Sequence, residues 1–254
     1  MMVNSKPKLK VPDIIHTKYD EMLIPYNNIA SKVNELSSNP FEQNFTTRNG
    51  IVVDLREFAS RIESVLYKLR WAAKGLEQVL NVYDKYGGSL DARLRGMTDT
   101  VTEDLIFYED VFFYFGYSAL DIVAGIIDKL VETGIERRNV YFTTVLDFLA
   151  SQDSPYARST FTELQRDSYT GWIHELRQYR IFITHHSRIP LQSQFIHSQS
   201  DKTTEINLFL LPDDPSETPC TYEEKRKLGP YCVEALSKEL DVVKVLLEFI
   251  EKLI

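Results

Sequence analysis

The sequence predicts an all-α protein, an up-down helical bundle of about five to six helices with a small β-hairpin insertion before the C-terminal helix. Three observations lead to this prediction. Apolar residues recur in steps of three and four along most of the chain. Glycine and proline are scarce, at 10 each in 254 residues. The helical period changes once, after Pro190. We expect residues 1–254 to form a single domain.

Composition narrows the class of protein. Hydrophobic residues make up 43% of the chain and charged residues 26%, which is typical of a globular protein. The net charge of −8 argues against non-specific wrapping of nucleic acid, although a local basic site is compatible with it. Two cysteines and the lack of a signal peptide favour a reducing, cytoplasmic location without membrane insertion.

The first two helices follow from their apolar stripes. Residues 13–37 form one stripe, and Pro25 is expected to kink it. Residues 37–50 are expected to form a loop. Residues 51–86 give the clearest helix, with Gly87 as its C-terminal stop. Its sustained pattern of three and four is typical of nearly antiparallel bundle packing.

A central helix is expected over residues 102–133. It is apolar almost all round, so other helices should cover it on most sides, and Gly134 should end it. Charged residues interrupt its most apolar part, residues 111–131, which favours a core helix over a membrane span.

The last third of the chain contains the β insertion. A short helix is expected at about 138–150 and a longer one at about 155–186, beginning with a proline in its first turn. Residues 193–211 favour a hairpin, because β-favouring stretches flank a polar turn. The C-terminal helix is expected at about 222–254, with Pro230 bending or restarting it.

Acidic residues in the central helix need an explanation, because burying an unpaired carboxylate costs several kcal/mol or shifts its pKa. If Asp121 is buried, it must meet a cation or hydrogen-bond donors, and Arg180, His185 and His186 on another helix are candidates. Alternatively, Asp121 faces solvent or caps a neighbouring helix. Glu109 and Asp110 are expected on a solvated stripe.

The stretch YRIFITHH, residues 179–186, contains the candidate catalytic residues Arg180 and His185. An imidazole can transfer protons near neutral pH, and a guanidinium can bind a phosphate through two hydrogen bonds. RNA supplies its own nucleophile, the ribose 2′-OH, so no metal is needed. His186, Tyr179 and Asp121 are candidate supporting residues. We expect neither a metal nor a cofactor, because no ligand spacing or phosphate loop is present.

A second interpretation of the same stretch is structural. Arg180 would pair with a buried acid, and the two histidines would cap the helix C-terminus, where cations are favoured. On one straight helix, Arg180 and His185 point about 140° apart. They converge only if the helix ends near Thr184 or if two chains meet across a twofold axis.

The Arg-x4-His spacing of Arg180 and His185, late in a long helix of an all-α bundle, resembles the HEPN superfamily (higher eukaryotes and prokaryotes nucleotide-binding domain). The doubled histidine, the FFYFGYSALDIV segment on an earlier helix, and the hairpin with a C-terminal helix also resemble it. The resemblance covers residues 50–254 and is nearest to the larger bacterial branches close to abortive-infection proteins.

The resemblance implies a helical bundle that forms a homodimer with the motifs facing each other. It also implies a metal-independent endoribonuclease of a toxin–antitoxin or phage-defence system, with RNA as substrate and a nucleotidyltransferase-like antitoxin as partner. The residue after the family arginine is often polar, whereas here it is Ile181. This departure keeps an alternative open, namely a non-catalytic HEPN-like module for dimerisation or for binding a nucleotide or partner.

Overall fold

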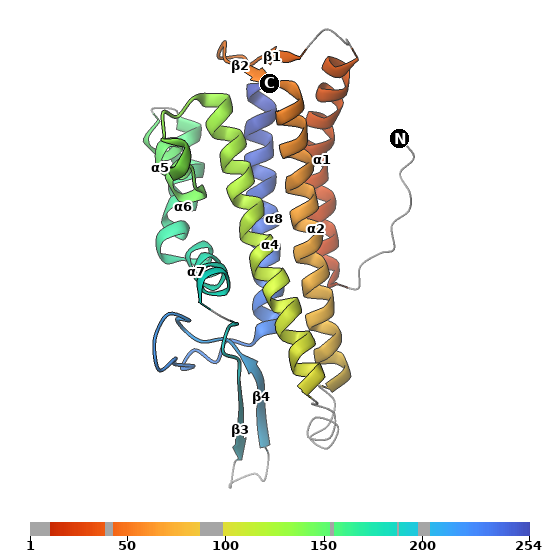
Figure 1. The fold of residues 1–254 in the computed structure, drawn as a ribbon, viewed down its shortest axis with the longest axis vertical. Coiled ribbons are helices and arrows are strands. Elements are labelled where there is room, and N and C mark those ends of the chain that lie inside the picture. The colour runs from red at the N-terminus through yellow and green to blue at the C-terminus, as the bar shows by residue number, and fades with distance from the viewer. Residues whose placement is uncertain (1–10, 39–42, 87–98, 153–154, 187, 198–203) are drawn as a thin grey trace.

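The computed structural model describes residues 11–38, 43–86, 99–152, 155–186, 188–197 and 204–254. The fold is mostly helical, at 74%, and the described residues form seven α-helices and two short antiparallel β-ribbons. The all-α bundle with a small β insertion is therefore confirmed (Figure 1).

Four long helices form the bundle: α1 (Asp13–Ser37), α2 (Leu55–Tyr86), α4 (Asp99–Val131) and α8 (Leu228–Leu253). They lie side by side along the long axis of the molecule in Figure 1, with α2 packed on α4 and α1 on α8. The first three alternate in direction. In contrast, α8 runs parallel to α4, because the chain returns to the other end of the bundle before α8 begins.

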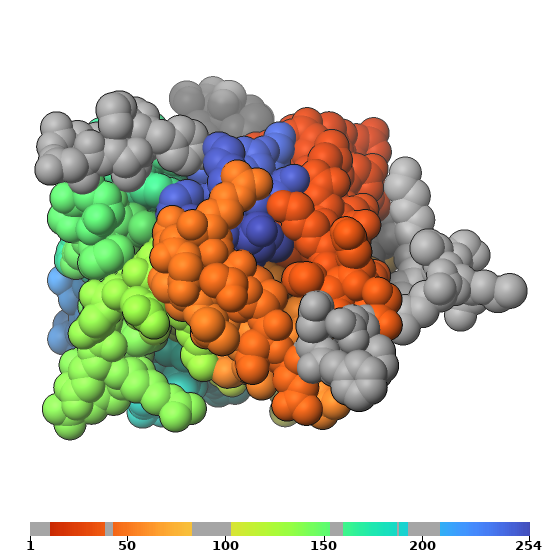
Figure 2. Space-filling model, turned by 90° about the horizontal axis from the view of Figure 1, so that it is seen from above, coloured from red at the N-terminus to blue at the C-terminus, as the bar shows by residue number. Residues whose placement is uncertain are grey.

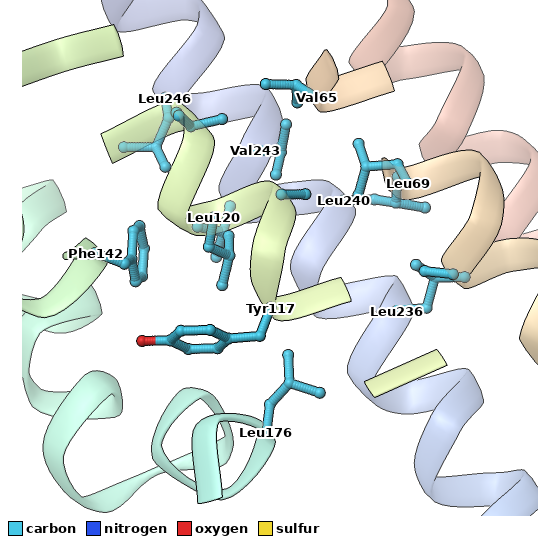
Figure 3. Close-up of a cluster of buried hydrophobic side chains, with 14 of the residues drawn as sticks. Val65, Leu69, Tyr117, Leu120, Phe142, Leu176, Leu236, Leu240, Val243 and Leu246 are labelled. Carbon is cyan, nitrogen blue, oxygen red and sulfur yellow. The ribbon is translucent and has the colours of Figure 1, made fainter. Parts of the chain in front are cut away.

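Helix α4 has other helices on most sides, as its apolar composition predicts. It contacts α2, α5, α7 and α8. By length and composition, residues Glu103–Val131 could cross a membrane, but 61% of their most apolar stretch is buried inside the bundle. Figure 3 shows side chains from these helices meeting around α4, each at most 2% exposed: Val65, Leu69, Tyr117, Leu120, Phe142, Leu176, Leu236, Leu240, Val243 and Leu246.

Three short helices cover one side of α4: α5 (Phe142–Ser151), α6 (Pro155–Thr170) and α7 (Trp172–His185). The expectation of one helix over 155–186 is wrong, because Gly171 separates α6 from α7. Its backbone is extended, with φ −109° and ψ −161°. A Cβ at this position would lie 2.9 Å from the Cα of Asp167, so glycine is the residue that permits the break.

A β-ribbon replaces part of the expected loop at 37–50 and the first residues of the helix expected at 51–86, which begins at Leu55. Strands β1 (Asn44–Thr46) and β2 (Val52–Asp54) pair antiparallel, and the middle residue of each strand is buried. The period-two signal spans three residues in each strand, which is too short to be distinguished in the sequence. The ribbon covers the end of the bundle beside the C-terminus (Figure 2), where the N–H of Arg48 donates to the carbonyl of Leu253 at 2.8 Å.

The predicted hairpin is present before the C-terminal helix. Strand β3 (Gln192–His197) pairs antiparallel with β4 (Thr204–Leu210). These strands extend away from the end of the bundle where α8 begins (Figure 1).

The C-terminal helix begins at Leu228, so the expected start near 222 is wrong. The carboxylate of Asp213 accepts the N–H groups of Glu223 and Glu224 at 2.8 and 3.1 Å, which holds that stretch in a turn. Pro230 then lies in the first turn of α8. There its missing N–H costs no helical hydrogen bond, so it neither bends nor restarts the helix.

Gly75 marks the closest approach of α2 to α4. A Cβ there would lie 2.8 Å from the carbonyl oxygen of Tyr108 and 2.9 Å from the backbone nitrogen of Phe112. These are backbone atoms of a central helix, so they cannot move aside without separating the two helices. Only glycine allows this contact.

We expect Gly75→Ala to lower the free energy of unfolding by about 1–3 kcal/mol, as overpacking does, although alanine is the better helix former. Chemical denaturation of the variant, with Ser60→Ala at an exposed position of α2 as control, measures this change. An unchanged or higher stability of Gly75→Ala would contradict the close packing of α2 on α4.

Candidate functional site

Helix α7 positions the candidate arginine. Its apolar face, which includes Ile173, Leu176 and Tyr179, is buried against the bundle. Arg180 follows at the edge of this face and is partly buried. Its Nε is inaccessible to solvent and has no hydrogen-bond partner among the described residues. A buried donor without a partner is costly, and an acceptor outside the protein can reach this guanidinium only through its terminal nitrogens.

Asp121 is not an ion-pair partner of Arg180. Instead, its Oδ1 accepts the N–H of Phe142 at 3.2 Å and so caps the start of α5. Burial raises the pKa of Asp121, while this hydrogen bond and the charges of Arg180 and Arg177 act in the opposite direction. Asp121 therefore caps a neighbouring helix, and the donor that it meets is the N–H of Phe142, while Arg180 acts on it only through its charge.

The two histidines lie at the C-terminal end of α7 and are exposed. The ring of His186 stacks on that of Phe182, with centroids 5.3 Å apart. The helix is continuous from Arg180 to His185, so the two side chains point about 140° apart and do not converge within one chain. Both histidines also occupy the end of a helix dipole that favours cations.

Tyr179 has a structural position. It is 1% exposed, its hydroxyl donates to the carbonyl of Pro212 at 2.7 Å, and it accepts a hydrogen bond from Nη1 of Arg226 at 3.0 Å. Burial raises its pKa far above the ordinary value of a tyrosine. These contacts leave the hydroxyl unavailable to an exposed substrate. The expected helper role of Tyr179 therefore does not fit its environment.

The structure adds a surface that the sequence interpretation missed. We call Tyr67, Lys68 and Trp71 of α2 together with Tyr114 and Phe115 of α4 the aromatic face. The Lys68 Nζ lies 4.5 Å from the ring centroid of Phe115 and 5.2 Å from that of Tyr114. Trp71 stacks on Phe115 at 5.9 Å. The sequence does contain a signal for this face, because Tyr67 and Trp71 are four residues apart and lie off the apolar stripe of α2.

Positive charge gathers beside the aromatic face. Burial lowers the pKa of Lys68, and the charge of Arg180 lowers it further. The charges of Arg177 and Arg180 both act to lower the pKa of Asp121 and that of Tyr117. None of Lys68, Arg177 and Arg180 forms an ion pair with a residue that the structure describes. Three cations in this arrangement can bind an anion.

The expectation of a solvated stripe is wrong for Glu109. This residue is completely buried, and neither of its carboxylate oxygens has a hydrogen-bond partner within the described ranges. Burial and the neighbouring Asp110 raise its pKa well above the ordinary value. Asp110 is partly buried, which raises its pKa to about 6. Glu109 is buried because α8 packs on the side of α4 that carries it. The periodicity of α4 does not show which helix covers that side.

A metal centre is not formed by the part of the chain that the structure describes. No group of three or more histidine, cysteine, aspartate or glutamate side chains there could hold a metal ion. Comparisons with known protein families, with curated proteins and with solved structures found no match.

Proposed function

We propose that the protein is a HEPN-like endoribonuclease that cleaves RNA without a metal ion. The observation that supports this proposal is the guanidinium of Arg180, which lacks an acidic partner among the described residues and lies beside Lys68 and Arg177. In a chain of net charge −8, such a local group of cations favours a phosphate ligand.

The site is completed by a second copy of the chain. Arg180 and His185 diverge on α7, whereas a homodimer with its twofold axis near the C-terminal half of α7 can place Arg180 of one protomer beside His185 of its partner. Twofold contacts are the commonest association of identical chains. Each dimer would then contain two equivalent sites.

The chemistry uses groups of the chain and of the RNA. His185 removes the proton of the ribose 2′-OH, whose oxygen bonds to the adjacent phosphorus as the bond to the 5′-oxygen breaks. The leaving 5′-oxygen takes up a proton from water, the protonated His185 returns its proton to solvent, and Arg180 stabilises the negative charge that develops at phosphorus. The products are a 2′,3′-cyclic phosphate and a 5′-hydroxyl.

The biological setting proposed for this activity is a bacterial toxin–antitoxin or phage-defence system in the cytoplasm. A nucleotidyltransferase-like antitoxin is the proposed partner. The resemblance of the 180–185 motif and its helical context to the HEPN superfamily supports this setting.

A second candidate function is a non-catalytic HEPN-like module that dimerises or binds a nucleotide or partner. Two observations favour it: Arg180 and His185 do not meet within one chain, and apolar Ile181 follows the arginine. Under this alternative, Arg180 still binds an anion, but RNA remains intact. Cleavage assays therefore separate the two functions.

We expect the purified protein to cleave mixed RNAs at the same rate with and without EDTA. No step of the proposed reaction uses a metal, and the 2′-OH supplies the nucleophile. The products should carry 2′,3′-cyclic phosphates, which mass spectrometry of the fragments detects. Loss of cleavage in EDTA, or products with 3′-hydroxyl ends, would contradict this mechanism, and intact RNA under varied conditions would favour the binding module.

A further inference from the structure

The aromatic face has the composition of a nucleotide-binding surface. Tyr67 is 53% exposed, Trp71 42% and Tyr114 40%, although large aromatic side chains on a bundle usually turn inward. Ring contacts connect them: Tyr67 meets Trp71 at 6.2 Å, and both meet Phe115. The rings therefore form one continuous surface across α2 and α4.

Cations border this surface. Lys68 lies over the rings of Tyr114 and Phe115, and the positive charge of Arg180 is close enough to lower the pKa of Lys68. Neither cation has an acidic partner within the described part of the chain. The acid on which the charge of Arg180 acts is Asp121 of α4, which forms no ion pair with it and whose pKa is raised by burial. An aromatic surface next to unpaired cations matches a ligand that offers both a flat base and a phosphate.

We propose that the aromatic face is a stacking platform that holds single-stranded RNA next to the Arg180 site. This inference rests on the proposed ribonuclease function and specifies its substrate as single-stranded. Bases on Tyr67, Trp71 and Tyr114 must be unstacked from their neighbours, which a duplex does not allow. Lys68 contacts a backbone phosphate, and the strand continues to Arg180.

A second copy of the chain fits this face less well. In a twofold contact centred on the face, Lys68 and Arg180 of one protomer would approach the same residues of its partner. Four cations would then be brought together, and like charges in apposition oppose association. An anionic, base-containing strand instead complements both the charge and the rings.

Binding is measured by fluorescence anisotropy with a labelled oligouridylate of about 12 nucleotides and with a duplex of the same length. The protein is the full chain carrying His185→Ala, so that the RNA stays intact. The single strand is expected to bind more tightly than the duplex. Trp71→Ala should weaken binding to the single strand about 5- to 150-fold, the range for removing one stacked base. Ile24→Ala, an exposed apolar position on α1, should leave binding unchanged.

Lys68→Ala tests the phosphate contact separately. It should lower the slope of log affinity against log salt by about 0.7, the value for one phosphate of a single strand. Trp71→Ala should leave that slope unchanged, because a stacked base releases no counterion. Trp71→Phe keeps an aromatic ring and should retain most of the binding.

Three results would overturn the platform: equal binding of duplex and single strand, unchanged binding by Trp71→Ala, or conversion of a dimer to monomers by Trp71→Ala in light scattering. The last result would make the face a dimer interface. These results differ from failure of the proposed function, in which the wild-type protein binds RNA but does not cleave it. If binding depends on Trp71 and cleavage is absent, the platform stands and the ribonuclease proposal falls.

Discussion

Arg180→Ala and His185→Ala are each expected to lower the rate of RNA cleavage by a factor on the order of 10²–10⁴. His185 supplies the proton transfer, and Arg180 supplies the charge that stabilises the phosphorus centre. Both variants should fold, because His185 is exposed and the Arg180 guanidinium forms no hydrogen bond at Nε and no ion pair with a described residue. His174→Ala, on the same helix, is the matched control and should cleave at the wild-type rate.

Mixing the two inactive variants gives a sharper result. In a dimer with one chain of each kind, one of the two composite sites contains Arg180 and His185 together. Random association of equal amounts should therefore restore roughly a quarter of the wild-type rate. Subunit exchange followed by a cleavage assay measures this recovery.

The mixing experiment distinguishes the two ways of forming the site. If both residues acted within one chain, no mixture could recover activity, because every chain would lack one of them. A monomeric mass by light scattering at tens of micromolar would also count against the composite site. Cleavage that survives in both single variants would point to a contaminating nuclease.

The second large effect concerns Glu239, which is completely buried on α8. Neither carboxylate oxygen has a hydrogen-bond partner among the described residues. Gly116 of α4 leaves the space for this carboxyl group, since a Cβ there would lie 3.0 Å from Oε2 of Glu239. Burial raises the pKa of Glu239 to about 8, so the carboxyl group is protonated in the folded protein at neutral pH.

This raised pKa makes stability depend on pH. Below the unfolded value, near 4.5, both states carry the proton and the dependence vanishes. As pH rises from there to about 8, the unfolded chain loses the proton and the folded chain keeps it, so the free energy of unfolding falls. At pH 8 the loss from this group is on the order of 4 kcal/mol.

Glu239→Gln should remove this loss, because glutamine has the shape of the protonated carboxyl group and never ionises. We expect the variant to exceed the wild type in stability at pH 8 by several kcal/mol and to approach it near pH 4.5. Denaturation at a series of pH values measures the difference. Glu234→Gln, at an exposed position of α8, is the control. A constant difference between Glu239→Gln and the wild type at all pH values would contradict the raised pKa.

The apolar period by itself determined the bundle. Steps of three and four predicted the long helices, the almost wholly apolar 102–133 segment predicted the central position of α4, and the change of period after Pro190 predicted the hairpin. Such patterns are sufficient because a helix must bury one continuous stripe, which the sequence displays directly. Two element boundaries depended instead on contacts that the period does not encode. At Gly171 the close approach of Asp167 permits only glycine, and before Leu228 the carboxylate of Asp213 holds the chain in a turn.

Only the tertiary structure decided the environment of each polar residue. The sequence singled out Arg180, but its neighbours Lys68 and Arg177 lie on other turns or helices, and their convergence depends on how α2, α4 and α7 pack. Likewise, Glu109 looks solvated on α4 alone and is buried by α8. The physical reason is that periodicity reports which side of one helix is apolar, whereas burial, pairing and pKa depend on the helices that pack against it.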